Sequence, residues 1–165
     1  MIIQLLQKSH NRKNFSCEEE SLTEYIKKQA SQDIRKRLAT CFVASDEEQN
    51  VIGYYTLTSE SLGREMIPGK YLTQIPQNYN APVILLGRLA RDISMKGSGL
   101  GEHLLLDALF RSYTLSKESI GAMAVVVDPI NKKAIYFYKR YGFEQLQDTH
   151  KMFLPMKVIG QLILQ

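Results

Sequence analysis

The stretch Arg88–His103, RLARDISMKGSGLGEH, is the most informative part of this sequence for the fold. It predicts an apolar strand that is followed by a glycine-rich turn and then a helix. Gly97, Gly99 and Gly101 alternate in the turn, and Lys96 precedes them. Glycine allows a sharp turn and a close approach of the backbone to a ligand. The first N–H groups of a helix have no intrahelical partner, and the helix dipole adds positive charge there. The pattern therefore predicts an anion site, most often one for phosphate.

Length and composition indicate one globular domain over residues 1–165, with 44% hydrophobic residues and enough chain for one substantial core. Cys17 and Cys41 are the only cysteines. Two cysteines make no disulfide framework, and no Cys/His cluster has zinc spacing, so we expect reduced thiols, no metal and a cytoplasmic protein. The apolar runs are too short for a membrane span, and a signal-peptide core is lacking. The net charge of +4 suggests an anionic partner.

Hydrophobic patterns predict alternating strands and helices, which indicates an α/β or α+β domain with a mixed sheet. Val83–Ile93 is the most apolar strand and is expected to be central. The remaining predicted strands are Met1–Leu6, Thr40–Ser45, Val51–Leu62, Ala122–Asp128 and Lys151–Met156, and two predicted helices are Gly99–Ser116 and a segment after Pro129 that ends at Gly142.

Two further segments carry specific expectations. Ser16 is predicted to cap a first helix that begins with Glu18, Glu19 and Glu20, with Phe15 and Cys17 beneath it and a division near Ser31. The segment Gly63–Pro82 is rich in glycine and proline. A loop of this length is usually functional, so it is either a wall of the substrate site or a partly helical connection without a function.

Three glycine-loop families compete for the turn. A P-loop requires a Gly-Lys-Ser/Thr ending, which is absent, and the dinucleotide fingerprint requires G-x-G-x-x-G, whereas the spacing here is G-x-G-x-G. The segment KGSGLGEHLL resembles the acetyl-coenzyme A loop of the GNAT acetyltransferases, Gln/Arg-x-x-Gly-x-Gly/Ala, with Lys96, Gly99 and Gly101 at the defined positions. The later segment NKKAIYFYKRYGF, residues 131–143, resembles the family helix that carries Phe-Tyr and ends in Gly-Phe.

The segments GYYTLTSESL and LLGRLARD extend the resemblance, over roughly Phe15–Pro155, to the GNAT toxins of type II toxin–antitoxin modules. The resemblance implies a single GNAT-like domain with a mixed, mostly antiparallel sheet flanked by helices. It also implies acetyl transfer from acetyl-CoA to the α-amino group of aminoacyl-tRNA, which halts translation, as well as a ribbon-helix-helix antitoxin and a homodimer. Lys96 and Ser98 depart from the residues that the family often has there.

The resemblance also implies the site residues. Tyr138 would be the acid that protonates the leaving thiolate, and the backbone of Leu89, Ala90 and Arg91 would pair with the pantetheine arm. Asn131 either holds the pantetheine or caps its helix. The residues expected at the cofactor phosphates are Lys96, Gly97, Ser98, Gly99, Leu100, Gly101 and Glu102.

The acceptor is the open question at this stage. An α-amino group has a pKa of about 7.7–8.0, so a usable fraction is neutral at pH 7 and no strong base is needed. Asp92 and Glu60 are weak candidates for steering the amine. The alternative is a GNAT enzyme that acts on a small amine or a protein N-terminus and is not a toxin. Contacts to tRNA phosphates are expected from Arg35, Lys36, Arg37, Lys132 and Lys139, with Arg91 as a further candidate.

Overall fold

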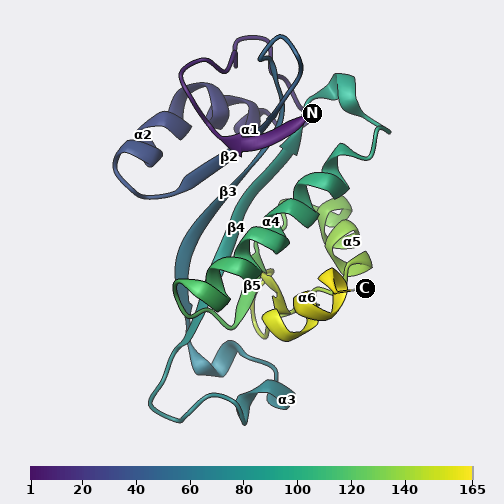
Figure 1. Ribbon diagram of the computed structural model, residues 1–165. Helices are drawn as coiled ribbons and strands as arrows, with labels where there is room; N and C mark the ends of the chain where they lie inside the picture. The colour runs from purple at the N-terminus through teal and green to yellow at the C-terminus, as the bar shows by residue number, and fades with distance from the viewer. Residues whose placement is uncertain (165) are drawn as a thin grey trace. The chain divides into compact units, whose positions relative to one another are not determined.

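A computed structural model describes residues 1–164 (Figure 1). Most predicted elements are present. They run in the order β1 (Ile2–Leu5), α1 (Glu20–Glu24), η1 (Tyr25–Gln29), α2 (Ala30–Arg35), β2 (Thr40–Ser45), β3 (Val51–Leu62), η2 (Arg64–Met66), α3 (Gly69–Leu72), β4 (Ala81–Arg91), η3 (Ile93–Met95), α4 (Leu100–Glu118), β5 (Ala124–Val127), α5 (Lys132–Arg140), β6 (Glu144–Gln145), β7 (Met152–Pro155) and α6 (Met156–Ile163).

The strands form one seven-stranded sheet in the order β1-β2-β3-β4-β5-β7-β6. β1 with β2, β2 with β3, β5 with β7 and β6 with β7 pair antiparallel, whereas β4 and β5 pair in parallel. A parallel pair needs a crossover connection, and α4 lies in the chain between these two strands. The predicted mixed, mostly antiparallel sheet with helices is therefore confirmed, and β4 is the central strand.

The chain divides into two compact units. Unit 1 contains Met1–Thr58 and Gly87–Ala108, and unit 2 contains Ser59–Leu86 and the chain from Leu109 onward. The three divisions fall inside β3, β4 and α4, so each of these elements contributes to both units.

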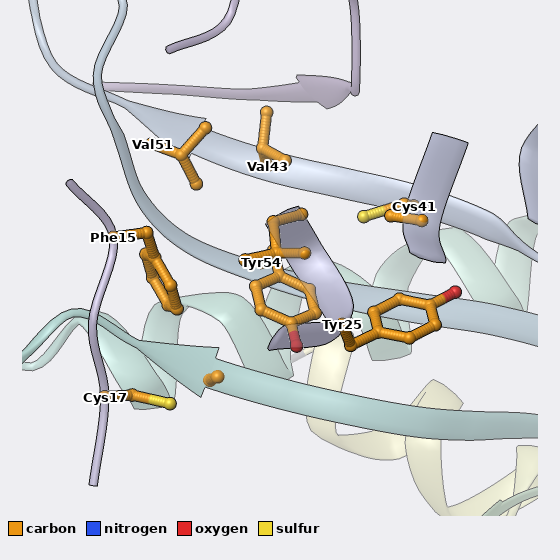
Figure 2. Packing of buried hydrophobic residues seen from close by; sticks show 10 residues of the cluster. Phe15, Cys17, Tyr25, Cys41, Val43, Val51 and Tyr54 are labelled. Carbon is orange, nitrogen blue, oxygen red and sulfur yellow. The ribbon is translucent and has the colours of Figure 1, made fainter. Parts of the chain in front are cut away.

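The core of unit 1 is built around Tyr54 of β3 (Figure 2). Its ring meets that of Phe15 edge-on, with centroids 5.6 Å apart, and stacks with that of Tyr25 at 6.1 Å. The Tyr54 hydroxyl donates to the Leu22 carbonyl at 2.6 Å. Phe15 and Cys17 are both buried in this cluster, which confirms their predicted place beneath the first helix.

The core of unit 2 includes buried residues from the long segment after β3. Ile67 and Ile75 are buried together with Phe153 of β7, and the ring of Tyr71 meets that of Phe153 edge-on at 5.3 Å. The segment contains η2 and α3. It is therefore partly helical, and its function as a wall of the substrate site stays a prediction.

The predicted start of the first helix is wrong. α1 begins at Glu20 with Glu19 at the N-cap, and no side chain caps it. The Ser16 N–H instead donates to the Asp92 carboxylate at 2.8 Å, and the Ser16 carbonyl accepts from the Ile93 N–H at 2.8 Å. These contacts hold the backbone around Ser16 outside the helix. The expected division near Ser31 is replaced by the π-helical η1, which joins α1 to α2.

The elements that were not predicted include β6 and α6. β6 has only two residues, which is too short for a periodic signal. α6 has buried Met156, Ile159 and Gly160 on one face, a helical spacing that the sequence does display. A Cβ on Gly160 would lie 2.9 Å from Cε2 of Tyr113, so glycine permits the close approach of α6 to α4 within unit 2. Among the described residues, no helix is long and apolar enough to cross a membrane.

Candidate active site

The glycine turn follows β4 in unit 1 and is shaped by local hydrogen bonds. Asp92 caps η3, accepting from the Ser94 N–H at 3.0 Å and the Ser94 hydroxyl at 2.6 Å. The Met95 carbonyl then accepts from the Ser98 N–H at 3.1 Å and the Ser98 hydroxyl at 2.6 Å. These bonds reverse the chain so that α4 begins at Leu100.

The three glycines have two different functions in this turn. Gly97 and Gly99 have φ angles of 79° and 84°, a left-handed conformation that disfavours residues with a Cβ. Gly101 has no such constraint, and a Cβ there would meet no atom within 4 Å. The space beside Gly101 and the first-turn N–H groups of α4 fit a bound pyrophosphate.

The side chains around the turn are mostly exposed. Lys96 and Ser98 face solvent, whereas Ala90 and Leu100 are buried. The Ser98 hydroxyl also accepts from the Leu100 N–H at 3.3 Å, so it supports the start of α4. All predicted cofactor residues except Asn131 belong to unit 1.

Arg91 and Asp92 at the end of β4 hold the segment that precedes α1. Nη1 of Arg91 lies 3.1 Å from Oε1 of Glu18. Partial burial alone would raise the pKa of Asp92, but hydrogen bonds from Ser94 and Ser16 bring it below its ordinary value. The sequence analysis missed this anchoring function, because Ser16 and Asp92 are far apart in the chain. Asp92 is thus occupied by structural contacts.

Glu60, the other carboxylate considered for the amine, lies in unit 2. Its Oε1 pairs with Nζ of Lys151, and both side chains are largely buried. Its Oε2 is buried and has no hydrogen-bond partner within residues 1–164.

Tyr138 lies on α5 in unit 2, on the helix face that packs inward. Only 8% of its surface is exposed. Its ring meets those of Phe137 and Phe143 edge-on, each with centroids 5.3 Å apart. Burial raises the pKa of the Tyr138 hydroxyl above its ordinary value of 10. The side chain is therefore a fixed phenol that stays protonated at physiological pH, as a proton donor requires.

Asn131 is the N-cap of α5. Its side-chain oxygen accepts from the Ala134 N–H at 2.9 Å. This oxygen satisfies one of the free donors of the helix start. The structure thus provides the capping function that the sequence analysis gave as one of two alternatives.

The predicted RNA-contacting residues occur on two separate elements. Arg35, Lys36 and Arg37 are exposed at the end of α2 in unit 1, and Arg37 has a φ of 61°. Lys132 and Lys139 are exposed on α5 in unit 2. Across residues 1–164, no group of three or more metal-ligating side chains is placed to hold an ion.

The order of these elements, with a strand and glycine turn before the tyrosine helix, agrees with a family match. The model of the Acetyltransferase (GNAT) family matches residues 2–143. The chain belongs to the GNAT acetyltransferase family. A "tRNA-acetylating toxin" of Mycobacterium tuberculosis is 37% identical over 151 residues, which cover 91% of this chain and 89% of that protein.

Solved structures of GNAT toxins share the fold. A tyrosine-to-phenylalanine mutant of KacT is 32% identical with a TM-score of 0.90, and each chain covers 98% of the other. AtaT in complex with acetyl-methionyl-tRNAfMet is 30% identical, also with a TM-score of 0.90 and 98% coverage of both chains. AtaT bound to the C-terminus of the antitoxin AtaR and acetyl-CoA is 27% identical with a TM-score of 0.84, covering 99% of this chain and 98% of that one.

Proposed function

We propose that this protein is a toxin that transfers acetyl from acetyl-CoA to the α-amino group of aminoacyl-tRNA and so blocks translation. The observation that carries this proposal is the likeness, over nearly the whole chain, to AtaT solved with acetyl-methionyl-tRNAfMet. The identity to the mycobacterial tRNA-acetylating toxin supports the same acceptor.

The turn residues of unit 1 would hold the cofactor. The backbone at Gly97, Ser98, Gly99, Leu100, Gly101 and Glu102 would bind the pyrophosphate, and Lys96 would add positive charge. The backbone of Leu89, Ala90 and Arg91 would pair with the pantetheine arm, while Asn131 would act mainly through its cap. Acetyl-CoA, when bound, supplies an activated acetyl thioester.

Tyr138 would donate the proton that the departing thiolate requires. A phenol with an ordinary pKa of about 10 is a suitable donor to a thiolate of about 8.5, and burial keeps the hydroxyl protonated. KacT and AtaT have both been solved as tyrosine-to-phenylalanine mutants, so a tyrosine hydroxyl was the group removed in each of those proteins.

The acceptor amine would need little help from the protein. A neutral fraction of an α-amino group already exists at pH 7, so positioning contributes more than a base. Asp92 and Glu60 are engaged elsewhere, which agrees with a mechanism that lacks a strong general base.

Binding of tRNA would rely on the exposed cations at Arg35, Lys36, Arg37, Lys132 and Lys139. Contacts of this kind release counterions, so the affinity should fall steeply with salt. Reversing charges among these residues should weaken acetylation of tRNA and leave acetyl-CoA binding unchanged.

We further propose the partners and setting. AtaT has been solved with the C-terminus of its antitoxin AtaR, which supports an antitoxin partner here. From the family resemblance, we propose a ribbon-helix-helix antitoxin, a homodimer and a cytoplasmic location. We also propose that residues 1–165 form one acetyltransferase domain, of which Gln165 lies outside the described residues.

The decisive experiment supplies labelled acetyl-CoA together with charged tRNA, uncharged tRNA, free amino acids or a peptide. Label on the charged tRNA alone is the expected result. Label on free amines or on the peptide N-terminus instead would make the protein a GNAT enzyme for a different acceptor. Tyr138→Phe serves as the inactive control.

A further inference from the structure

The outer face of α5 carries more than Lys132 and Lys139, the two lysines that the proposed tRNA contacts use. Lys132, Lys133, Tyr136, Lys139 and Arg140 are all exposed on this nine-residue helix. Their spacing is that of one helix face, because neighbours three and four residues apart lie together. The opposite face carries the Tyr138 packing.

Tyr136 is the feature of this face that needs an explanation. Its side chain is 72% exposed, although it stands in the middle of the helix. The other aromatic side chains of the segment, Phe137, Tyr138 and Tyr141, contact one another or Phe143. Tyr136 therefore contributes little to the core, and its ring is available to a ligand.

The charges beside Tyr136 are all positive. α5 contains no acidic residue, and within residues 1–164 Lys132, Lys133 and Lys139 form no ion pair. The Arg140 guanidinium lies near the rings of Phe137 and Tyr141, at 6.0 Å and 5.9 Å from their centroids. The positively charged side chains from Lys132 to Lys139 extend over about 10 Å along the helix axis.

A flat aromatic ring between cations is the composition of surfaces that bind single-stranded nucleic acid. Such surfaces combine positive charge for the backbone with an aromatic ring on which a base stacks. A second copy of the same face would bring like charges together, which disfavours a self-contact.

We propose that Tyr136 stacks on an unpaired base at the 3′ end of the bound tRNA, while Lys132, Lys133 and Lys139 contact the phosphates beside it. The inference rests on the proposed function, because an aminoacyl group is attached at that 3′ end. It adds a residue that positions the acceptor and takes no part in proton transfer.

The test measures the dissociation constant of aminoacyl-tRNA for the full chain and for matched variants. Tyr136→Ala should weaken binding about 5- to 150-fold, the loss expected when the aromatic ring under one stacked base is removed. Tyr136→Phe keeps the ring and should bind within about twofold of the unaltered protein. Phe110→Ala, which removes a 53% exposed aromatic ring from α4, should have no effect.

A second arm uses tRNA that lacks its unpaired 3′ nucleotides. On this probe Tyr136→Ala and the unaltered protein should bind equally. An equal loss on intact and shortened tRNA, or no loss on intact tRNA, would overturn the inference. These outcomes are separate from failure of the proposed function, which would appear as an unaltered protein that does not acetylate charged tRNA.

Discussion

The glycine turn and α5 carry the two family motifs, but the motif of the turn concerns the backbone and that of α5 concerns the side chains. In the turn, the left-handed backbone of Gly97 and Gly99 sets the course of the chain, and the side chains of Lys96 and Ser98 face solvent. In α5, the side chains differ by face, since Tyr138 is buried and Tyr136 is exposed. A backbone site depends on conformation and open space, whereas a side-chain site depends on chemical identity.

This difference explains why departures from the family pattern fall where they do. Lys96 and Ser98 differ from the residues that are often found there, and both are exposed positions of the turn. Tyr138 and Phe143 keep the family residues, and both are buried against each other. Substitutions at four residues test the contrast.

The largest effect is expected from Tyr138→Phe. Removing one hydroxyl should lower kcat about 100- to 10,000-fold, the range of general acid catalysis. The ring contacts with Phe137 and Phe143 remain, so thermal unfolding and acetyl-CoA affinity should stay unchanged. Steady-state acetylation of charged tRNA measures the loss, with Tyr141→Phe as the control. Turnover within a few-fold of the unaltered protein would remove Tyr138 from the chemistry.

Gly101→Ala and Gly99→Ala should separate backbone space from backbone conformation. Gly101→Ala meets no protein atom, and the family loop pattern accepts alanine at this position, so the unfolding free energy should stay equal or rise by up to about 1 kcal/mol and acetyl-CoA affinity should stay within a few-fold. Gly99→Ala forces a left-handed alanine and should destabilise the fold by about 1–2 kcal/mol. Calorimetric titration and chemical denaturation give both values. A large loss of cofactor affinity in Gly101→Ala without a loss of stability would contradict the expectation that this position accepts alanine.

Asn131→Ala should cost about 1 kcal/mol of stability, because the Ala134 N–H loses its acceptor. Asn131→Ser keeps a capping oxygen and should recover most of that loss. If Asn131 acts only as a cap, acetyl-CoA affinity in Asn131→Ser will equal that of the unaltered protein. Weaker cofactor binding in this variant would instead support a direct contact to the pantetheine.

The smallest expected effect concerns the rate of acetyl transfer, which should not change with pH through titration of Tyr138. Because burial raises the pKa of the Tyr138 hydroxyl above 10, this hydroxyl should stay protonated throughout pH 7–9. Single-turnover acetyl transfer should therefore show no alkaline decline from this group in that interval. A decline centred between pH 7 and 9 that Tyr138→Phe abolishes would contradict the expected direction of the shift.

Local patterns made much of the fold predictable. The strands Thr40–Ser45 and Val51–Leu62 agree with β2 and β3, and Gly142, with a φ of 93°, follows α5 as expected. The turn glycines stood out by their spacing, whereas Tyr138 was assigned through the resemblance to the family helix. These features depend on residues that are close together in the sequence.

The rest depends on contacts between distant residues. Ser16 has the sequence context of a helix cap, but its N–H donates to Asp92, 76 residues later in the chain. The helix therefore begins only at Glu20. The ion pair of Arg91 with Glu18 likewise joins residues that are far apart in the sequence. Asn131 remained ambiguous because capping and ligand contact call for the same residue type, and only the hydrogen bond to Ala134 reveals the cap.

The three divisions between the compact units fall inside β3, β4 and α4, and this has a consequence for how the coding sequence can be cut. Each unit is assembled from two stretches of chain that are separated by part of the other. A truncation at Thr58 would leave unit 1 without Gly87–Ala108, and so without Ala90 of its own core and the whole glycine turn. Neither unit is therefore a portable module that could be expressed by simple truncation.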